Sequence, residues 1–430
     1  MEYLMNYGRT GLSLDLPDHW NVTVIRKKPM PVLSDPAAAM ARVLKEPVGS
    51  KTLAEEAEGR SNVCIVICDV TRPVPNGLIL PALVRELLEA GIGPDRITIL
   101  VATGLHRPNE GDELRDVAGD DWVLDTVRVV NHFARNDEDH ADLGFTSRGT
   151  PIKLDRRFVE ADLRVVTGLV EPHFMAGYSG GRKVVVPGIA HQDTITRLHT
   201  ARFLESPRAA NCILDGNPLH EEQVEIVKRI GGALAVNAVI DELRQPCFLN
   251  FGDIIQSHLA AIDFMRPYAE ITVPRRFRTV ITSAAGYPLD KTYYQTVKGM
   301  VGAMDVLEPG GDLFIVSECS EGMGSIDFVE AQKRLVALGT QEFIEELRPK
   351  EYAAVDEWET EMQLKAMRIG SIRFYSGCLC GEDLQQTGVE TFADLNRFHE
   401  AISQSVEQSG DLSVAVIPEG PYVVPFCRLS

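Results

Sequence analysis

The segment EPHFMAGYSGGRK, residues 171–183, holds a lysine ten residues after a histidine, beside a glycine-rich turn that carries a hydroxyl. Glycine adopts positive φ angles and lets a ligand approach the backbone closely. A lysine there can neutralise a phosphate or, when desolvated, act as a nucleophile that forms a covalent adduct. An ordinary tight turn with a solvated lysine explains the pattern equally well. Arg182 precedes Lys183 and Val184 follows it, so the phosphate-loop pattern of nucleotide triphosphatases is not met.

Histidines are the next candidates, because imidazole can be a general acid, a general base or a metal ligand near neutral pH. His106, in ATGLHRP, and His173, in EPHFMAG, each follow a strand-like apolar run. His199 stands in TITRLHTARFL, which we expect to be helical. For His199 the residues alone favour a packed or surface histidine.

A possible binding pair, Asp69 and Arg72, stands in CDVTRPVP. An aspartate at a strand end can accept hydrogen bonds from ribose hydroxyls, and an arginine offers a planar fork to a carboxylate or phosphate. In the alternative, Asp69 makes an Asx-type turn that caps the next helix, and Arg72 is solvated. The residues leave both interpretations open.

The second half of the chain adds YPLDKTYYQTVKGM, where Gln295 and Lys298 are three residues apart on an expected helix. They would share one face and could bind an anionic substrate, although a solvated helix face is the simpler explanation. Trp358, in DEWETEMQ, could wall a pocket or belong to a core.

Short apolar runs that alternate with helical segments must position these residues. The runs are 63–68, 97–102, 127–130, 163–167, 280–283 and 313–317. This alternation predicts an α/β fold with mainly parallel sheets, whose ligands gather at the carboxyl ends of the strands. A proline and basic residues follow Ile271 before a new strand begins. We therefore expect one domain over 1–270 and a second over 271–430.

Composition narrows the class of protein. The 430 residues are 44% hydrophobic and 24% charged, as in a folded protein. A net charge of -19 repels polyanions and argues against nucleic acid or an anionic membrane surface as a partner. The N-terminus lacks the pattern of a secretory signal and no apolar run could span a membrane, so we expect a cytoplasmic protein.

The positions of the eight cysteines are not those of a disulfide framework. Cys378 and Cys380 form a CxC pair that could hold a soft metal, but no second pair at zinc-site spacing accompanies it.

Six motifs in order along the chain resemble the nickel-pincer lactate racemase family. They are DVTRPVP at 69–75, TGLHRP at 103–108, EPHFMAGYSGGRKVVVPGIA at 171–190, GNPLH at 216–220, GYPLDKTYYQTVKG at 286–299 and EWETEMQ at 357–363. The third is long and specific, and the six together span nearly the whole chain.

The resemblance implies two α/β domains that enclose an active-site cleft. The first would bind the cofactor and carry the catalytic residues, and the second would close over the substrate. The implied cofactor is a nickel(II) pincer nucleotide, pyridinium-3-thioamide-5-thiocarboxylic acid mononucleotide, attached covalently to Lys183. Nickel would be held by two sulfurs and a ring carbon of the cofactor and by His199, in a field that suits nickel(II). For His199 the resemblance thus overrules the residue-level interpretation.

The resemblance also implies the reaction and its residues. The cofactor would take a hydride from the α-carbon of a 2-hydroxy acid while a base removes the hydroxyl proton. His106 and His173 would exchange the roles of base and acid for the two enantiomers. The implied substrate-binding residues are Arg72, Tyr294, Gln295, Lys298 and Trp358. The implied cofactor contacts, besides Lys183, are Asp69, Gly177, Ser179, Gly180 and Gly181, with Asp69 contacting either the cofactor or an active-site histidine.

The substrate is expected to be a small 2-hydroxy acid, such as lactate, a diacid or a sugar acid. Cofactor-biosynthesis proteins are expected partners, and a homo-oligomer is possible. Two other functions stay open: a lysine Schiff-base enzyme built around Lys183, and a protein that binds a hydroxy acid without turnover. The retained pair of His106 and His173 argues against the second, because binding alone needs no matched proton carriers.

Overall fold

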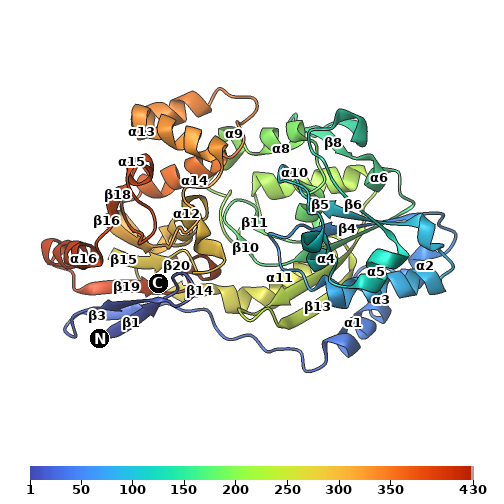
Figure 1. Ribbon diagram of the computed structural model, residues 1–430, viewed down its shortest axis with the longest axis horizontal. Coiled ribbons are helices and arrows are strands. Elements are labelled where there is room, and N and C mark those ends of the chain that lie inside the picture. The colour runs from blue at the N-terminus through green and yellow to red at the C-terminus, as the bar shows by residue number, and fades with distance from the viewer. Residues whose placement is uncertain (428–430) are drawn as a thin grey trace. The chain divides into compact units, whose positions relative to one another are not determined.

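The computed structural model describes residues 1–427, which form two compact units. Unit 2 comprises Pro29–Leu198 and Arg208–Arg266, and unit 1 comprises Met1–Lys28, His199–Pro207 and the chain from Pro267 onward. Each unit is built on a six-stranded, mainly parallel sheet with helices packed on it (Figure 1). The predicted α/β class with mainly parallel sheets is confirmed.

The sheet of unit 2 has the strand order β13-β12-β9-β4-β5-β6. Its strands are β4 (Val63–Cys68), β5 (Ile97–Ala102), β6 (Arg128–Asn131), β9 (Leu163–Leu169), β12 (Leu234–Ile240) and β13 (Pro246–Asp253). Neighbours pair in parallel, except that β13 is antiparallel to β12. The first four apolar runs of the sequence therefore form the four consecutive strands β9, β4, β5 and β6 of this sheet.

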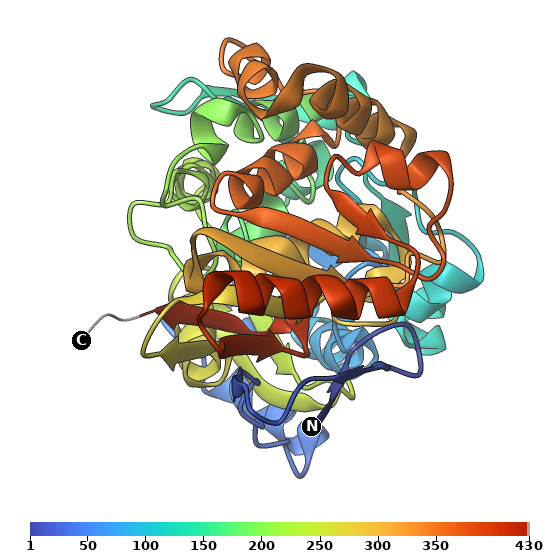
Figure 2. The same cartoon turned by 90° about the vertical axis from the view of Figure 1, so that its left-hand side faces the viewer.

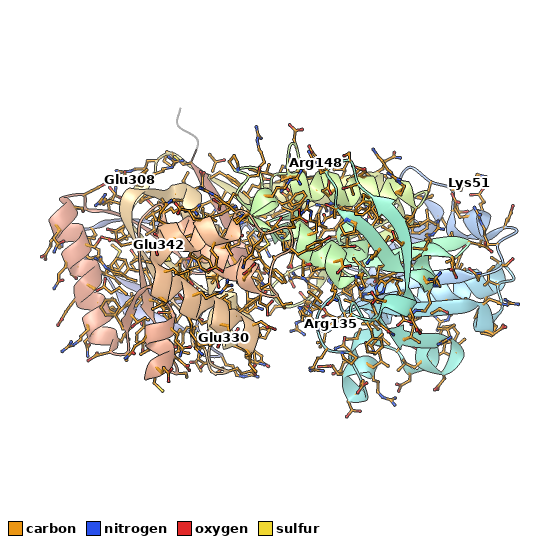
Figure 3. The ribbon with its side chains drawn as sticks, turned by 90° about the horizontal axis from the view of Figure 1, so that it is seen from above. Lys51, Arg135, Arg148, Glu308, Glu330 and Glu342 are labelled. Carbon is orange, nitrogen blue, oxygen red and sulfur yellow. The ribbon has the colours of Figure 1, made fainter. Side chains whose placement is uncertain are left out.

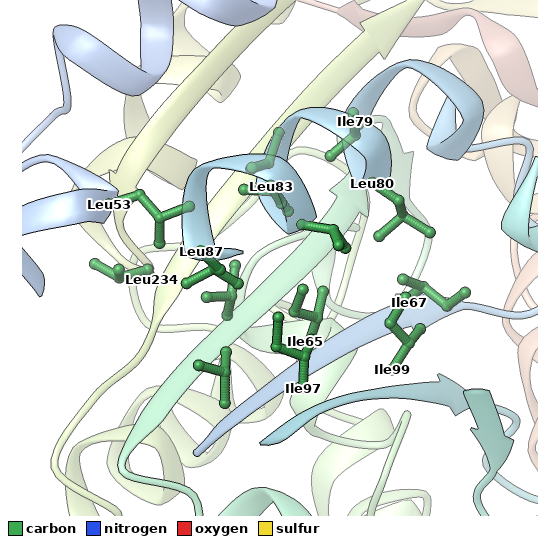
Figure 4. Packing of buried hydrophobic residues seen from close by; sticks show 14 of the residues in the cluster. Leu53, Ile65, Ile67, Ile79, Leu80, Leu83, Leu87, Ile97, Ile99 and Leu234 are labelled. Atoms are coloured by element: carbon green, nitrogen blue, oxygen red, sulfur yellow. The ribbon is translucent and has the colours of Figure 1, made fainter. Parts of the chain in front are cut away.

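The helices of unit 2 surround this sheet, and some of them pack on it directly. The helices are α1 (Pro36–Lys45), α2 (Leu53–Ala57), α3 (Asn76–Glu89), α4 (Asp112–Ala118), α5 (Asp121–Thr126), α6 (Arg156–Val159), α7 (Arg182–Val185), α8 (Gln192–Leu198), α10 (Pro218–Arg229) and α11 (Gln256–Ala269), the last running into unit 1. Leu80, Leu83 and Leu87 of α3 lie in one core with Ile65 and Ile97 of the sheet (Figure 4). Burying one such side chain stabilises the fold by roughly 1.5–3 kcal/mol.

Two small hairpins complete unit 2. One pairs β7 (His140–Phe145) with β8 (Pro151–Asp155), and the other pairs β10 (Pro172–His173) with β11 (Gly177–Tyr178). The second hairpin lies inside the EPHFMAGYSGGRK segment and directly follows β9.

The sheet of unit 1 has the order β18-β17-β16-β15-β19-β3, all parallel. Its strands are β3 (Asn21–Val24), β15 (Phe277–Ser283), β16 (Leu307–Val316), β17 (Ser371–Tyr375), β18 (Glu390–Phe392) and β19 (Ser413–Ile417). Two strand pairs stand apart from it, β1 (Glu2–Met5) with β2 (Leu12–Asp15) and β14 (Glu270–Val273) with β20 (Val424–Cys427). The last two strands of the described chain, β19 and β20, thus belong to unit 1.

Helices of unit 1 are α9 (Ala201–Leu204), α12 (Tyr293–Gly302), α13 (Ile326–Leu347), α14 (Glu357–Met367), α15 (Glu382–Gln386) and α16 (Leu395–Ser409). Figure 2 shows α16 lying across one face of the sheet, where Phe398, Ile402 and Val406 recur every four residues and enter the core. In residues 1–427 no helix is both long and apolar enough to cross a membrane.

The compact units differ from the predicted domain ranges at two places. Residues 1–28 pack in unit 1 because β3 adds to its sheet beside β19. Residues 199–207 also belong to unit 1, where α9 packs against α14. The split near the predicted boundary falls between Arg266 and Pro267.

Candidate active site

Three neighbouring strands of unit 2 end in the residues that the sequence singled out. Asp69 follows β4, the TGLHRP turn with His106 follows β5, and β10 with His173 follows β9. The three strands are parallel and adjacent, so their carboxyl ends reach the same edge of the sheet. This is the edge at which parallel sheets bind ligands.

Asp69 uses its two carboxylate oxygens for two different contacts. Oδ2 lies 2.7 Å from Nδ1 of His106, while Oδ1 accepts hydrogen bonds from the backbone N–H and the hydroxyl of Thr71. Burial alone would raise the pKa of Asp69, but the hydrogen bond from His106, its charge and the contacts with Thr71 and Arg72 lower it overall. An ionised Asp69 can only accept, so the Nδ1–H of His106 donates to it. Asp69 thus makes the Asx-type turn of the alternative interpretation, but it does not cap the next helix, because α3 has Pro75 at its N-cap and no side-chain cap.

Arg72 is held by a carboxylate that the sequence did not single out as a site residue. Its Nη1 lies 2.7 Å from Oε1 of Glu171, and both side chains are about a quarter exposed. Glu171 opens the EPHFMAG motif at the end of β9. A local reading of the sequence could not pair it with Arg72, because the contact depends on β9 lying beside β4.

The glycines of the turn are needed for packing against protein. Gly177, Gly180 and Gly181 all have positive φ angles, of 79°, 77° and 49°. A Cβ on Gly177 would lie 2.3 Å from the carbonyl oxygen of Ile213, and one on Gly181 would lie 2.7 Å from the ring of His258. We expected these glycines to make room for a ligand. At the position where a Cβ atom would stand, the space at Gly177 and Gly181 is instead filled by other residues of the chain.

Ser179 is likewise occupied within the turn. Its hydroxyl donates to the carbonyl oxygen of Leu169 at 2.7 Å and accepts from the N–H of Glu171 at 3.1 Å. The N–H groups of Gly180 and Gly181, by contrast, donate to no acceptor within residues 1–427. The hydrogen-bond donors that this turn leaves for a ligand are thus backbone N–H groups.

Lys183 is the second residue of the one-turn helix α7, and its side chain is half-buried. α7 packs against β4 and β9. Burial raises the pKa of Cys68, the last residue of β4, to about 12, and the charges of Arg72 and Lys183 oppose that rise. Lys183 therefore lies at the strand end that also carries Asp69 and Arg72.

A second group of predicted residues gathers in unit 1. His199 lies in a short break between α8 and α9, so the expectation that it belongs to a helix is wrong. Its ring centroid is 4.6 Å from that of Trp358, a buried residue of α14. Burial, with the charges of Glu359 and Asp356, raises the pKa of the Tyr294 phenol, and a hydrogen bond with Trp358 opposes the rise. An indole N–H can only donate, so Trp358 donates to the hydroxyl of Tyr294. Through this bond and its ring contact with His199, Trp358 connects His199 to Tyr294.

The helix α12 brings Tyr294, Gln295 and Lys298 to this group. Oε1 of Gln295 is buried and has no hydrogen-bond partner among the described residues. Burial raises the pKa of the Glu359 carboxyl on α14, and the charge of Lys298 opposes the rise, which places these two groups close together. Glu359 was missed because EWETEMQ resembles a solvated helix face, whereas in α14 almost every residue is buried.

Metal-binding side chains do not cluster in the described part of the chain: no group of three or more His, Cys, Asp or Glu residues could hold a metal ion. Cys378 and Cys380 are exposed free thiols. A metal held mainly by a cofactor would need only one protein ligand, so this finding is compatible with the implied role of His199.

The predicted residues thus form two sets, each within one unit. Unit 2 holds Asp69, Arg72, His106, His173, Gly177, Ser179, Gly180, Gly181 and Lys183, and unit 1 holds His199, Tyr294, Gln295, Lys298 and Trp358.

Comparisons with known proteins agree over most of the chain. Residues 7–211 match the lactate racemase N-terminal domain, and residues 275–424 match the lactate racemase C-terminal domain. The chain is 31% identical to a lactate racemase of Thermoanaerobacterium thermosaccharolyticum over 422 residues, 97% of each chain. It is also 31% identical to a lactate racemase of Lactiplantibacillus plantarum over 385 residues, 89% of each chain.

Solved structures show the same fold. The lactate racemase apoprotein of T. thermosaccharolyticum superposes with a TM-score of 0.90 at 30% identity, over 99% of this chain and 100% of that one. A protein from Thermotoga maritima, 17% identical, has the fold with a TM-score of 0.67, over 93% of this chain and 100% of that one.

Similarity of this extent, together with a common fold and a histidine–carboxylate pair at the ligand-binding edge of a sheet, defines an isomerase of the racemase class. The chain belongs to the lactate racemase family.

Proposed function

We propose that this racemase inverts the α-carbon of a 2-hydroxy acid, lactate or a related compound. The main support for this proposal is the contact between Asp69 and His106. It orients the imidazole of His106 so that its other nitrogen can accept the hydroxyl proton of such a substrate. Nδ1 of His106 donates to Asp69, so Nε2 of the neutral ring carries a lone pair. His106 is more than half exposed, so that lone pair is open to a substrate hydroxyl.

His173 is the second proton carrier in this proposal. It follows β9, the strand next to β4 on the side away from β5. A carbon is inverted only if it reacts on both of its faces. A proton carrier at the end of β5 and another at the end of β9, on the two sides of β4, suit such a reaction. His106 alone would serve only one face.

Arg72, Gln295 and Lys298 orient the substrate carboxylate or nearby anionic groups. The orphaned Oε1 of Gln295 supports this role, since a buried amide oxygen without a partner costs free energy that a ligand would recover. The Glu171 carboxylate fixes the Arg72 guanidinium on one side. Trp358 and Tyr294 border the substrate and support His199.

The residues fit a nickel(II) pincer nucleotide. Lys183 would carry the covalent link, the Gly180 and Gly181 N–H groups would bind its phosphate in a turn shaped by Gly177 and Ser179, and Asp69 would lie beside it. His199 would be the protein ligand of nickel. When bound, this group supplies a reversible two-electron acceptor for the α-carbon hydrogen. The protein's residues bind the acid and move its hydroxyl proton.

The test uses protein made in a host that has the cofactor-biosynthesis proteins. Intact-mass and metal analysis should show a lysine adduct and nickel, and a chiral assay with lactate, malate, phenyllactate and aldonates should find racemisation of at least one. Lys183→Ala should abolish both the adduct and racemisation. Wild-type protein that carries neither nickel nor an adduct, together with an unchanged rate in Lys183→Ala, would refute the proposal.

The same experiment separates the alternatives. A binding protein would retain a hydroxy acid without racemising it. A Schiff-base enzyme would be trapped at Lys183 by borohydride in the presence of a carbonyl substrate and would need no nickel. His106→Gln and His173→Gln should each abolish racemisation in the proposed enzyme.

A further inference from the structure

The hairpin formed by β10 and β11 points two backbone N–H groups at one ring nitrogen of His173. Nδ1 of His173 lies 3.3 Å from the N–H nitrogen of Met175 and 3.2 Å from that of Ala176. A backbone N–H can only donate, so Nδ1 must accept. In the neutral ring of His173 the proton is therefore on Nε2.

Buried side chains hold one of these peptide groups, Met175–Ala176, and the next one along the chain, Ala176–Gly177. Nδ2 of Asn217 donates to the carbonyl oxygen of Met175 at 2.9 Å, and Nη2 of Arg182 donates to that of Ala176 at 2.9 Å. Asn217 and Arg182 are both fully buried. Because its carbonyl is engaged by Asn217, the Met175–Ala176 peptide cannot turn that oxygen towards His173 without breaking a buried hydrogen bond, which costs about 1–3 kcal/mol. The bond from Arg182 restrains Ala176 from its other side.

The loop before α10 closes tightly on this hairpin. Nδ2 of Asn217 also donates to the carbonyl oxygen of Ile213, and the N–H of Cys212 donates to the carbonyl oxygen of Gly177. A Cβ at Gly177 would collide with Ile213. The GNPLH motif, to which no role has been assigned so far, thus supplies one arm of a clamp on the turn 173–177.

Arg182 makes the second contact of this clamp, although burying its charge is energetically unfavourable. Its guanidinium donates to Ala176 and to a ring nitrogen of His258, which itself donates from Nε2 to the carbonyl oxygen of Ser179. No carboxylate among the described residues forms a salt bridge with it, and burial lowers the pKa of Arg182 to about 9. A buried cation without a counter-ion is expensive, so a positioning role would explain the placement.

We propose that Asn217 and Arg182 are positioning residues that hold His173 in the tautomer with its proton on Nε2. His106, whose Nδ1–H donates to Asp69, is held in the opposite tautomer with an unprotonated Nε2. At rest the two histidines are therefore unequal: His106 is the base, and His173 presents a hydrogen-bond donor. This differs from the equal exchange of roles that the family resemblance implies, and its catalytic meaning rests on the proposed function.

The tautomer can be observed directly in the full-length protein labelled with ¹⁵N-histidine. Two-bond couplings from the ring C–H protons distinguish a protonated from an unprotonated ring nitrogen, and His173→Gln assigns the signals. We expect an unprotonated Nδ1 and a protonated Nε2 for His173 at neutral pH. A wild-type His173 that carries its proton on Nδ1 would overturn the inference.

Asn217→Ser tests the clamp without removing the helix cap. Asn217 caps α10 by accepting from the N–H groups of Leu219 and His220, and serine is an equally good cap but lacks the Nδ2 amide that donates to Met175 and Ile213. We expect a mixture of His173 tautomers in Asn217→Ser and in Arg182→Met, a retained tautomer in Arg182→Lys, and at least a tenfold lower kcat for the first two holoenzymes. An unchanged tautomer in Asn217→Ser would contradict the clamp even if Arg182→Met failed to fold.

Asn237→Ser is the matched control. Asn237 is a buried asparagine of the same unit whose side chain bonds Asn250 and Ser257 and neither the hairpin nor Asn217 or Arg182, so its replacement should lower stability and leave the His173 signals unchanged. The two proposals fail separately. If the holoenzyme racemises no 2-hydroxy acid, the proposed function fails whatever the tautomer. If it does racemise and His173 carries the proton on Nδ1, only the clamp fails.

Discussion

The rings of His199 and Trp358 lie with their centroids 4.6 Å apart, although they come from distant parts of the chain. Both belong to unit 1, where α9 packs against α14. Trp358 is in turn hydrogen-bonded to Tyr294 on α12. The aromatic contact fixes the imidazole that the family resemblance assigns to nickel.

We expect His199→Ala to lower the nickel retained per chain at least tenfold and to leave the lysine adduct detectable. The reason is that the covalent link and the protein ligand of the metal come from different residues. Metal analysis and intact mass on the same preparation measure both quantities. His19→Ala is the control, because His19 also packs edge-on against a tryptophan, Trp20, but is exposed and lies outside the site. Equal nickel loss in the two variants would contradict the assignment.

Asp69→Asn should lower the racemisation rate by roughly 10²- to 10⁴-fold, since the carboxylate that orients His106 is lost. The exposed Asp116→Asn on the neighbouring helix α4 should change nothing. A rate for Asp69→Asn within twofold of wild type would show that the pair has no catalytic role.

The lowered pKa of Asp69 also predicts a pH-dependent effect on folding. Its ionised form is favoured in the folded state, so its contribution to the free energy of unfolding is present at neutral pH and is lost as the pH falls through the folded-state pKa. Urea titrations should therefore show Asp69→Asn less stable than wild type at pH 7, with the difference shrinking in acid. A difference that stays constant with pH would argue against this linkage.

Lys183→Arg should keep the positive charge of the turn and eliminate the adduct, because a guanidinium stays protonated and does not act as a nucleophile. We expect racemisation to fall at least 10³-fold and the mass of the α7 peptide to equal that of its sequence. Lys228→Arg, at an exposed position of α10, should retain both activity and adduct. An adduct that persists in Lys183→Arg would move the attachment to another residue.

Glu361→Gln should stabilise the protein at alkaline pH. Burial, reinforced by the charge of Glu205, raises the pKa of Glu361 from 4.5 to about 8. The protonated form is thus favoured in the folded state, and its stabilising contribution is lost as the pH rises through about 8. Glutamine mimics the protonated carboxyl, so its advantage should grow between pH 5 and 9 to the order of a few kcal/mol.

Urea midpoints measured across that range test this prediction. Glu342→Gln is the control, at an exposed glutamate of α13 that is labelled in Figure 3. An advantage of Glu361→Gln that does not increase with pH would mean that the carboxyl is ionised in the folded protein.

Local patterns in the sequence were sufficient for the strands and for one edge of the site. Runs such as VCIVIC form parallel strands, and parallel strands bring their carboxyl ends to a common edge. The placement of Asp69, His106 and His173 at adjacent strand ends followed from that rule. Local patterns failed at His199, where a helical periodicity continues through a break between two short helices.

The sequence by itself therefore determined the class of fold, the strand ends and the chemical types available at them, because these depend on local periodicity and residue type. Tertiary structure decided which groups meet: Arg72 with Glu171, His199 with Trp358, β3 with the sheet of unit 1, and Asn217 and Arg182 with the backbone of the hairpin that carries His173. Those contacts join segments far apart in the chain. They are set by how sheets and helices pack, which no local pattern specifies.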